Sequence, residues 1–187
     1  MTRATAVVDT GPLVLLLENV DDPSHEASRP LRRAQNEETL HDYAKRARLV
    51  VPTPVIAELG REGSGLGKLR DQVVRRLAHV RTEPLTATAA DIAGKMRQAV
   101  LAQRGKDRER GAISYDALIA AIAHVTGARW LLTANAKHMQ TCLNVVKSTV
   151  EVVDTTESPK GKQLPLVVSA PQPPLPPKPA KKRTPKK

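Results

Sequence analysis

Short apolar runs alternate along the chain with longer segments of mixed polarity. The apolar runs have the length of buried strands and predict them at residues 6–8, 49–51 and 130–132, and the mixed segments 80–82 and 150–153 are expected to form two further strands. The intervening segments predict helices at residues 12–17, 24–48, 54–59, 68–77, 86–103 and 136–141, and between Ser114 and Gly127. Regular alternation of strands and helices favours an α/β fold, in which helices cover both faces of a parallel sheet.

Capping and breaking residues set the expected limits of these helices. Ser24 and Ser114 are suited to cap the helices that follow them, and Thr53-Pro54 is typical of a cap followed by proline at the first helical position. The glycine-rich residues 60–67 are expected to end the short helix before them, and residues 104–111 are expected to form a charged loop.

Positive charge is concentrated in the last 30 residues, from position 158 onward. That segment holds nine of the 15 prolines, eight basic residues and no acid, which predicts a disordered Pro/Lys-rich tail at residues 158–187. Residues 1–157 keep 22 bases and 19 acids, and they form one nearly neutral globular domain in this interpretation. The tail is either a solvating extension or a basic arm that slows release from nucleic acid.

Composition excludes several classes of protein. The chain has no Phe, one Trp and two Tyr, so single-strand binding by stacking of bases on aromatic side chains is not expected. The single Cys142 cannot form an intramolecular disulfide or a site of several cysteines, and we expect it to be a small buried apolar residue. No apolar stretch is long enough to span a bilayer, and the first residues lack the pattern of a signal peptide. We therefore expect a cytoplasmic protein without a membrane partner.

Three acidic residues follow a predicted strand or lie early in a predicted helix. Asp9 comes directly after the first strand, Glu58 lies in the first turns after Pro54, and Asp116 lies two residues beyond Ser114. Ligands of open α/β sheets bind at the carboxyl ends of the strands, so we expect the three carboxylates to meet there. Each acid also has a simple structural interpretation: Asp9 as a turn residue, Glu58 as a solvated helix charge and Asp116 as the partner of a helix dipole.

The surroundings of these acids favour a functional role. Glu58 lies among apolar residues, and Asp116 directly precedes residues 117–123, which are apolar on every side and predict a buried helix. Buried carboxylates need a positive partner, and a divalent hard cation suits a cluster of them. The chain has no set of His and Cys residues with zinc spacing. Mg²⁺ or Mn²⁺ is therefore the expected metal, and hydrolysis of phosphodiester bonds is the expected chemistry.

Four short motifs contain or follow these acids. They are VVDTGPL at residues 7–13, PVIAEL at 54–59, SYDALIAA at 114–121 and LLTAN at 131–135. In this order, over roughly residues 4–154, they resemble the PIN domain, and within it the VapC-type toxin ribonucleases. The resemblance implies a three-layer α/β/α sandwich with a central parallel sheet and metal-dependent endonuclease action on RNA. It also implies frequent homodimerisation and, for the toxin branch of a toxin-antitoxin system, inhibition by a protein antitoxin.

The resemblance also assigns roles to individual residues. Three acids match the positions that hold the metal ion and orient the attacking water: Asp9, Glu58 and Asp116. Asn135 falls where the family carries Asp or Asn, and its neutral oxygen can orient a water but brings no charge to a second metal. Thr10 and Thr133 match hydroxyl positions beside the site, where they would hydrogen bond to the metal ligands.

Two features depart from the family pattern. His138-Met139 stands where many relatives carry an acid followed by Phe, and residues 104–111 are a longer and more charged approach to Asp116 than is common. We interpret His138 as a surface histidine. In the alternative interpretation it approaches the site, and its charge at mildly acidic pH favours the binding of RNA phosphates.

Function is therefore expected to be that of a metal-dependent endoribonuclease, the toxin of a toxin-antitoxin pair. One alternative is a PIN nuclease of RNA processing or quality control without an antitoxin, and another is a catalytically weak PIN fold that binds RNA. A groove for RNA could be framed by eight basic residues, although such charges often form only a solvated helix face. These residues are Lys68, Arg70, Arg75, Arg76, Arg104, Lys106, Arg108 and Arg110.

Overall fold

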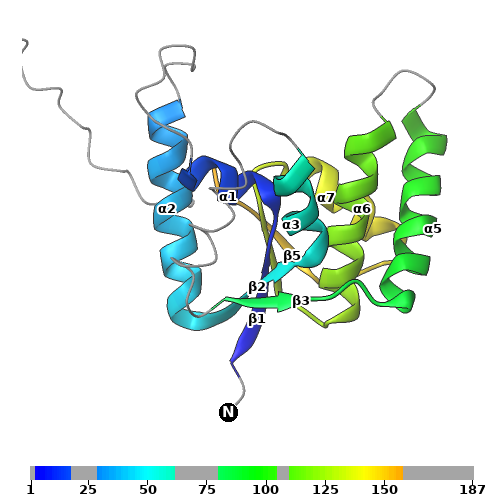
Figure 1. The fold of residues 1–187 in the computed structure, drawn as a ribbon, viewed down its shortest axis with the longest axis horizontal. Coiled ribbons are helices and arrows are strands. Elements are labelled where there is room, and N and C mark those ends of the chain that lie inside the picture. Colours follow the sequence, from blue (N-terminus) through cyan, green and yellow to red (C-terminus); the bar gives the residue numbers. More distant parts are fainter. Residues whose placement is uncertain (1–2, 18–28, 62–79, 105–109, 158–187) are drawn as a thin grey trace, which may run out of the picture.

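The computed structural model describes residues 3–17, 29–61, 80–104 and 110–157 (Figure 1). The strands are β1 (Ala4–Val8), β2 (Ala47–Pro52), β3 (Arg81–Glu83), β4 (Trp130–Thr133) and β5 (Glu151–Asp154). The helices are α1 (Thr10–Leu17), α2 (Arg29–Arg46), α3 (Thr53–Arg61), α5 (Ala87–Arg104), α6 (Arg110–Val125) and α7 (Ala136–Val145). Each of the five predicted strands overlaps an observed strand, which confirms the α/β fold class.

The five strands form one parallel sheet in the order β3-β2-β1-β4-β5. Val7 of β1 is paired with Val50 on one side and with Leu131 on the other, so β1 lies in the centre of the sheet. The chain builds the sheet outward from β1 through β2 to β3, and then returns to the other side of β1 with β4. Strand order thus reverses between β1 and β4, and ligand sites of open α/β sheets form at such a point.

Helices cover both faces of this sheet, as expected for a three-layer α/β/α sandwich. In Figure 1, α2 lies on one side of the sheet, and α3, α5 and α6 lie on the other. The strands β1 and β4 are apolar because both of their faces are covered, and Val8 and Leu132 are at most 1% exposed. Residues 119–123 of α6 are equally inaccessible, which confirms the buried helix predicted from their uniform apolarity.

Several predicted helix limits were wrong. Helix α6 begins at Arg110, so Ser114 lies inside it and does not cap it, and the two ends of the expected loop at 104–111 are helical. Helix α2 ends at Arg46, because the next two residues already pair with β1 as part of β2. Helix α3 begins at Thr53, the residue expected to cap it, but it ends at Arg61, within the glycine-rich range expected to end it. Tertiary packing can override local capping preferences of this kind.

Some predictions concern residues outside the described part of the chain. They are the cap at Ser24, the basic helix at 68–77, residues 105–109 of the charged loop and the tail at 158–187. Cys142 lies in α7 and is 2% exposed, as expected. Among the helices described, none has both the length and the apolarity needed to cross a bilayer.

Candidate active site at the carboxyl edge of the sheet

Asp9 occupies the point where strand order reverses, directly after β1. Its backbone N–H donates to the carbonyl of Leu132 at 2.9 Å, which continues the pairing of β1 with β4 by one residue. The side chain is held at both carboxylate oxygens, because the N–H of Thr10 donates to Oδ1 and the hydroxyl of Thr133 donates to Oδ2, each at 2.7 Å. Asp9 is only 5% exposed, so its orientation is fixed within the fold.

Burial raises the pKa of the Asp9 carboxyl from its ordinary value of 3.8 to about 7. The hydrogen bond from Thr133 lowers this pKa, the charge of Asp116 raises it, the backbone bond from Thr10 lowers it and the charge of Glu58 raises it. The influence of both other acids means that the three carboxylates share one electrostatic environment. Asp9 therefore changes its protonation state near neutral pH.

Glu58 reaches the same region from α3, where it is partly buried. The hydroxyl of Thr10 donates to its Oε2 at 2.5 Å. Thr10 is the first residue of α1 and therefore holds two acids at once, Asp9 through its backbone and Glu58 through its side chain. The predicted place of Thr10 beside the site agrees with these contacts.

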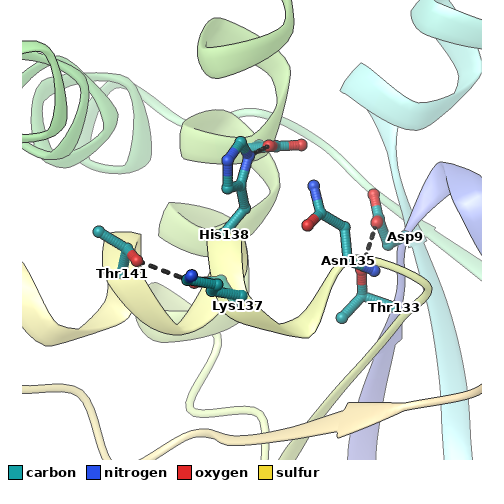
Figure 2. Close-up of polar contacts among 7 residues, drawn as sticks. Asp9, Thr133, Asn135, Lys137, His138 and Thr141 are labelled. Carbon is teal, nitrogen blue, oxygen red and sulfur yellow. Dashed lines mark hydrogen bonds and ion pairs between the residues drawn. The ribbon is translucent and has the colours of Figure 1, made fainter. Parts of the chain in front are cut away.

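Asp116 is the seventh residue of α6, almost two turns from the start of the helix. A helix dipole acts within the first turn, so the simple structural interpretation of this residue does not apply. Its Oδ2 lies 3.2 Å from Nδ1 of His138, a residue of α7 (Figure 2). The His138 side chain is only 21% exposed, so its interpretation as a surface histidine was wrong.

Thr133 and Asn135 lie in the connection between β4 and α7. Thr133 is completely buried, and its hydroxyl accepts a 2.9 Å hydrogen bond from the backbone of Asn135 while it donates to Asp9 (Figure 2). Asn135 precedes the first residue of α7, but its side chain makes no capping hydrogen bond to that helix. The side chain is exposed, which leaves its amide accessible to a ligand.

The donor set of this region suits a hard cation. Its side chains offer carboxylate, hydroxyl and amide oxygens, the atoms that Mg²⁺ and Mn²⁺ prefer. In the described ranges, no three His, Cys, Asp or Glu side chains are grouped closely enough to hold a metal ion as they stand. The structure therefore brings the acids into one electrostatic environment, and a cation would have to draw them closer together.

Only two of the eight basic residues expected to frame a groove for RNA lie in the described part of the chain. Six of these eight residues belong to ranges 62–79 and 105–109, outside the described residues. The other two are the last residue of α5, Arg104, and the first residue of α6, Arg110. The groove for RNA thus stays a prediction.

Comparisons with known proteins agree with this architecture. The PIN domain matches residues 6–142, which include all three acids. No curated protein sequence gave a significant match. Solved structures similar in fold include "VapBC2 from Rickettsia felis bound to a DNA fragment from their promoter", with 16% identity, a TM-score of 0.53, and coverage of 80% of this chain and 97% of that one.

Two further solved structures have the same fold. A VapBC-1 structure from nontypeable Haemophilus influenzae has 18% identity and a TM-score of 0.53, and the match covers 82% of this chain and 99% of that one. A DNA-bound VapBC from Salmonella typhimurium has 19% identity and a TM-score of 0.50, and the match covers 83% of this chain and 99% of that one. The sequence match spans most of the chain, and the parallel sheet carries acids at its central carboxyl edge. The chain belongs to the PIN domain family.

Proposed function

We propose that this protein is a Mg²⁺- or Mn²⁺-dependent endoribonuclease that uses Asp9, Glu58 and Asp116 to hold its metal ion. The supporting observation is that Asp9 lies at the switch point of the sheet and that the charges of Asp116 and Glu58 both raise the pKa of its buried carboxyl. Three negative charges in one partly buried region oppose each other, and a bound cation would offset that repulsion.

The chemistry that such an ion supplies when bound is activation of a water and neutralisation of charge on the phosphate oxygens. The protein's own residues fix the arrangement around it. Thr133 and the backbone of Thr10 orient Asp9, and the Thr10 hydroxyl orients Glu58. The exposed Asn135 amide is available to orient a water or the substrate. Because the pKa of Asp9 is about 7, a cation would compete with a proton for this carboxylate near neutral pH.

Incubation of the purified protein with total RNA, with and without Mg²⁺ or Mn²⁺, tests this proposal. We expect metal-dependent cleavage that Asp9→Asn and Asp116→Asn abolish, with the cleaved ends mapped to identify the target RNA. Asp91→Asn is the matched control, because Asp91 is exposed on α5 and paired with Lys95 at 2.7 Å. Cleavage of equal rate by Asp9→Asn, or in the presence of EDTA, would contradict the proposed chemistry.

We further propose that the protein is the toxin of a VapC-type pair, with a protein antitoxin as its partner. The resemblance of its motifs and the VapBC structures of similar fold support this. The domain also has an apolar cleft of about 330 Å³ between α1 and α2, which could receive an apolar segment of such a partner. Its lining includes five leucines, Leu13, Leu16, Leu17, Leu40 and Leu49.

A small reading frame immediately upstream of the gene is expected for a toxin and not for a nuclease of RNA processing. Its product should bind this protein and inhibit it. Leu16→Lys, in the cleft, should weaken the complex, whereas Leu31→Lys should not, because Leu31 is already 55% exposed on α2. Equal binding of both variants would exclude the cleft as the docking site. Light scattering of the free protein tests the expected homodimer.

A further inference from the structure

The contact between Asp116 and His138 joins two helices at the candidate active site. Oδ2 of Asp116, from α6, and Nδ1 of His138, from α7, are 3.2 Å apart, and the two side chains are 18% and 21% exposed. In the tautomer that carries its proton on Nδ1, the imidazole donates a hydrogen bond to the carboxylate. At this degree of burial the bond is less exposed to competing water than one on the surface.

The backbone connects His138 to the residues that hold Asp9. The N–H of His138 donates to the carbonyl of Asn135 at 3.1 Å, and the N–H of Asn135 donates to the hydroxyl of Thr133 at 2.9 Å. Thr133 in turn donates to Asp9. The short segment 133–138 therefore provides two side chains, Thr133 and His138, that contact two of the three acids (Figure 2).

We propose that His138 is a positioning residue that holds the Asp116 carboxylate in place for a metal ion, and that residues 133–138 act as one clamp on Asp9 and Asp116. The proposal rests on the proposed function. Carboxylates that ligate metals are themselves held by hydrogen bonds, and loss of such a bond weakens metal affinity. Asp116 stands on a buried helix, so a partner from a different helix restricts the remaining rotation of its side chain.

Titration calorimetry with Mn²⁺ alone tests this inference without relying on catalysis. His138→Ala should bind Mn²⁺ about 10-fold more weakly than the unchanged protein, the lower end of the range for lost hydrogen bonds to metal ligands. His138→Asn should retain most of the affinity, because its Nδ2 lies where the histidine Nδ1 lies and can donate the same bond. Gln140→Ala, exposed on α7 and outside residues 133–138, should leave the affinity unchanged.

The cleavage rate of His138→Ala distinguishes a positioning role of His138 from direct participation in the reaction. If His138 acts only through Asp116, raising the Mn²⁺ concentration should restore most of the cleavage rate of His138→Ala. A rate that stays low at saturating Mn²⁺ would overturn the positioning role, since it would mean that the imidazole acts on the substrate.

Two results of the calorimetry would also overturn the inference. One is an unchanged Mn²⁺ affinity in His138→Ala, and the other is an equal loss in His138→Asn and His138→Ala, which would mean that the hydrogen bond is not what matters. The variant Asp116→Asn distinguishes a failure of this inference from a failure of the proposed function. If Asp116→Asn loses affinity while His138→Ala does not, only the positioning role fails; if Asp116→Asn binds Mn²⁺ normally, the metal site itself is wrong.

Discussion

The hydroxyl group of Thr133 donates a 2.7 Å hydrogen bond to Oδ2 of Asp9, across 124 positions of sequence. The same hydroxyl accepts the N–H of Asn135, so its proton is directed at the carboxylate and cannot rotate freely. This bond favours the ionised form of Asp9 and opposes the effect of burial on its pKa. A single buried threonine thus helps to keep the central acid ionisable near neutral pH.

Thr133→Val should shift the pH dependence of RNA cleavage to higher pH. Valine has nearly the shape of threonine but cannot donate, so the pKa of Asp9 should rise above its value of about 7. Metal-dependent cleavage needs the ionised carboxylate, and its rate should therefore begin to rise at a higher pH. The pH–rate profile measures this at fixed Mn²⁺ concentration. Thr133→Ser should keep the original profile.

The matched control for this substitution is Thr141→Val in α7. The Thr141 hydroxyl donates to the carbonyl of Lys137 at 2.8 Å and does not contact an acid (Figure 2). Its loss should leave the profile in place. A profile that moves equally in both variants, or in neither, would contradict the role given to Thr133.

Asp9→Asn should stabilise the metal-free protein above pH 7. The folded-state pKa of Asp9, about 7, is raised above the unfolded value of 3.8, so the native state binds the proton more tightly. The free energy of unfolding therefore falls as pH rises from about 4 to 7, and the loss is complete above that range. At about 1.4 kcal/mol per pKa unit the full effect is at most roughly 4 kcal/mol.

Urea unfolding in EDTA at pH 5 and at pH 8 measures this effect. The unchanged protein should lose stability between the two pH values, and Asp9→Asn should lose less. Asp91→Asn removes a carboxylate that is exposed and paired with Lys95, and surface pairs of this kind contribute about 0.5 kcal/mol or less. An equal loss of stability in Asp9→Asn and the unchanged protein would mean that ionisation of Asp9 is not what destabilises the protein at high pH.

The sequence predicted the central strands β1 and β4 well because strands buried on both faces are largely apolar. Residues 6–8 and 130–132 are paired with each other at the centre of the sheet, and all six of these buried side chains are apolar. Apolarity does not encode which strands are neighbours, so the pairing of β1 with β4 and the switch point between them came only from the structure. Helix limits failed where packing extends a helix, as at Ser114 within α6.

The sequence singled out Asp9, Thr10, Glu58 and Thr133, which hydrogen bonds connect in the structure, whereas His138 was interpreted as a surface residue; the metal-binding roles stay a prediction. Asp9 directly follows an apolar strand and Thr133 is the last residue of another, and local sequence reveals both positions. The contact of His138 with Asp116 depends on how α7 packs on α6, which no local pattern shows. One signal was present: His138 lies three residues after Asn135, in the first turn of a helix, so the two residues share a face.

Gly11→Ala should reduce both stability and cleavage. A Cβ at position 11 would lie 3.0 Å from the Cβ of Ala134, in the connection that links Thr133 to Asn135. That contact is closer than side chains normally approach, so the backbone around Ala134 must shift by a few tenths of an ångström. We expect this overpacking to cost about 1 kcal/mol or more of stability. Gly94→Ala is the control, because nothing lies within 4 Å of its new Cβ. In the interior of α5 it should stabilise by up to about 1 kcal/mol.

Thermal unfolding and RNA cleavage of the two glycine variants provide the measurement. The prediction requires opposite signs, a loss of stability at position 11 and a gain at position 94. A Gly11→Ala protein as stable and as active as the unchanged one would mean that the connection between β4 and α7 adjusts without cost, and that the geometry around Thr133 is less constrained than its hydrogen bonds indicate.

Deletion of residues 158–187 should weaken RNA binding and reduce its dependence on salt. This segment contains eight basic residues and no acidic residue. Each contact of a basic residue with a phosphate of single-stranded RNA steepens the fall of log affinity with log salt concentration by about 0.7. Turnover at saturating RNA should not change, since the three acids lie in the domain. Binding isotherms at several KCl concentrations measure the slope. A slope equal to that of the full chain would show that the segment does not contact RNA.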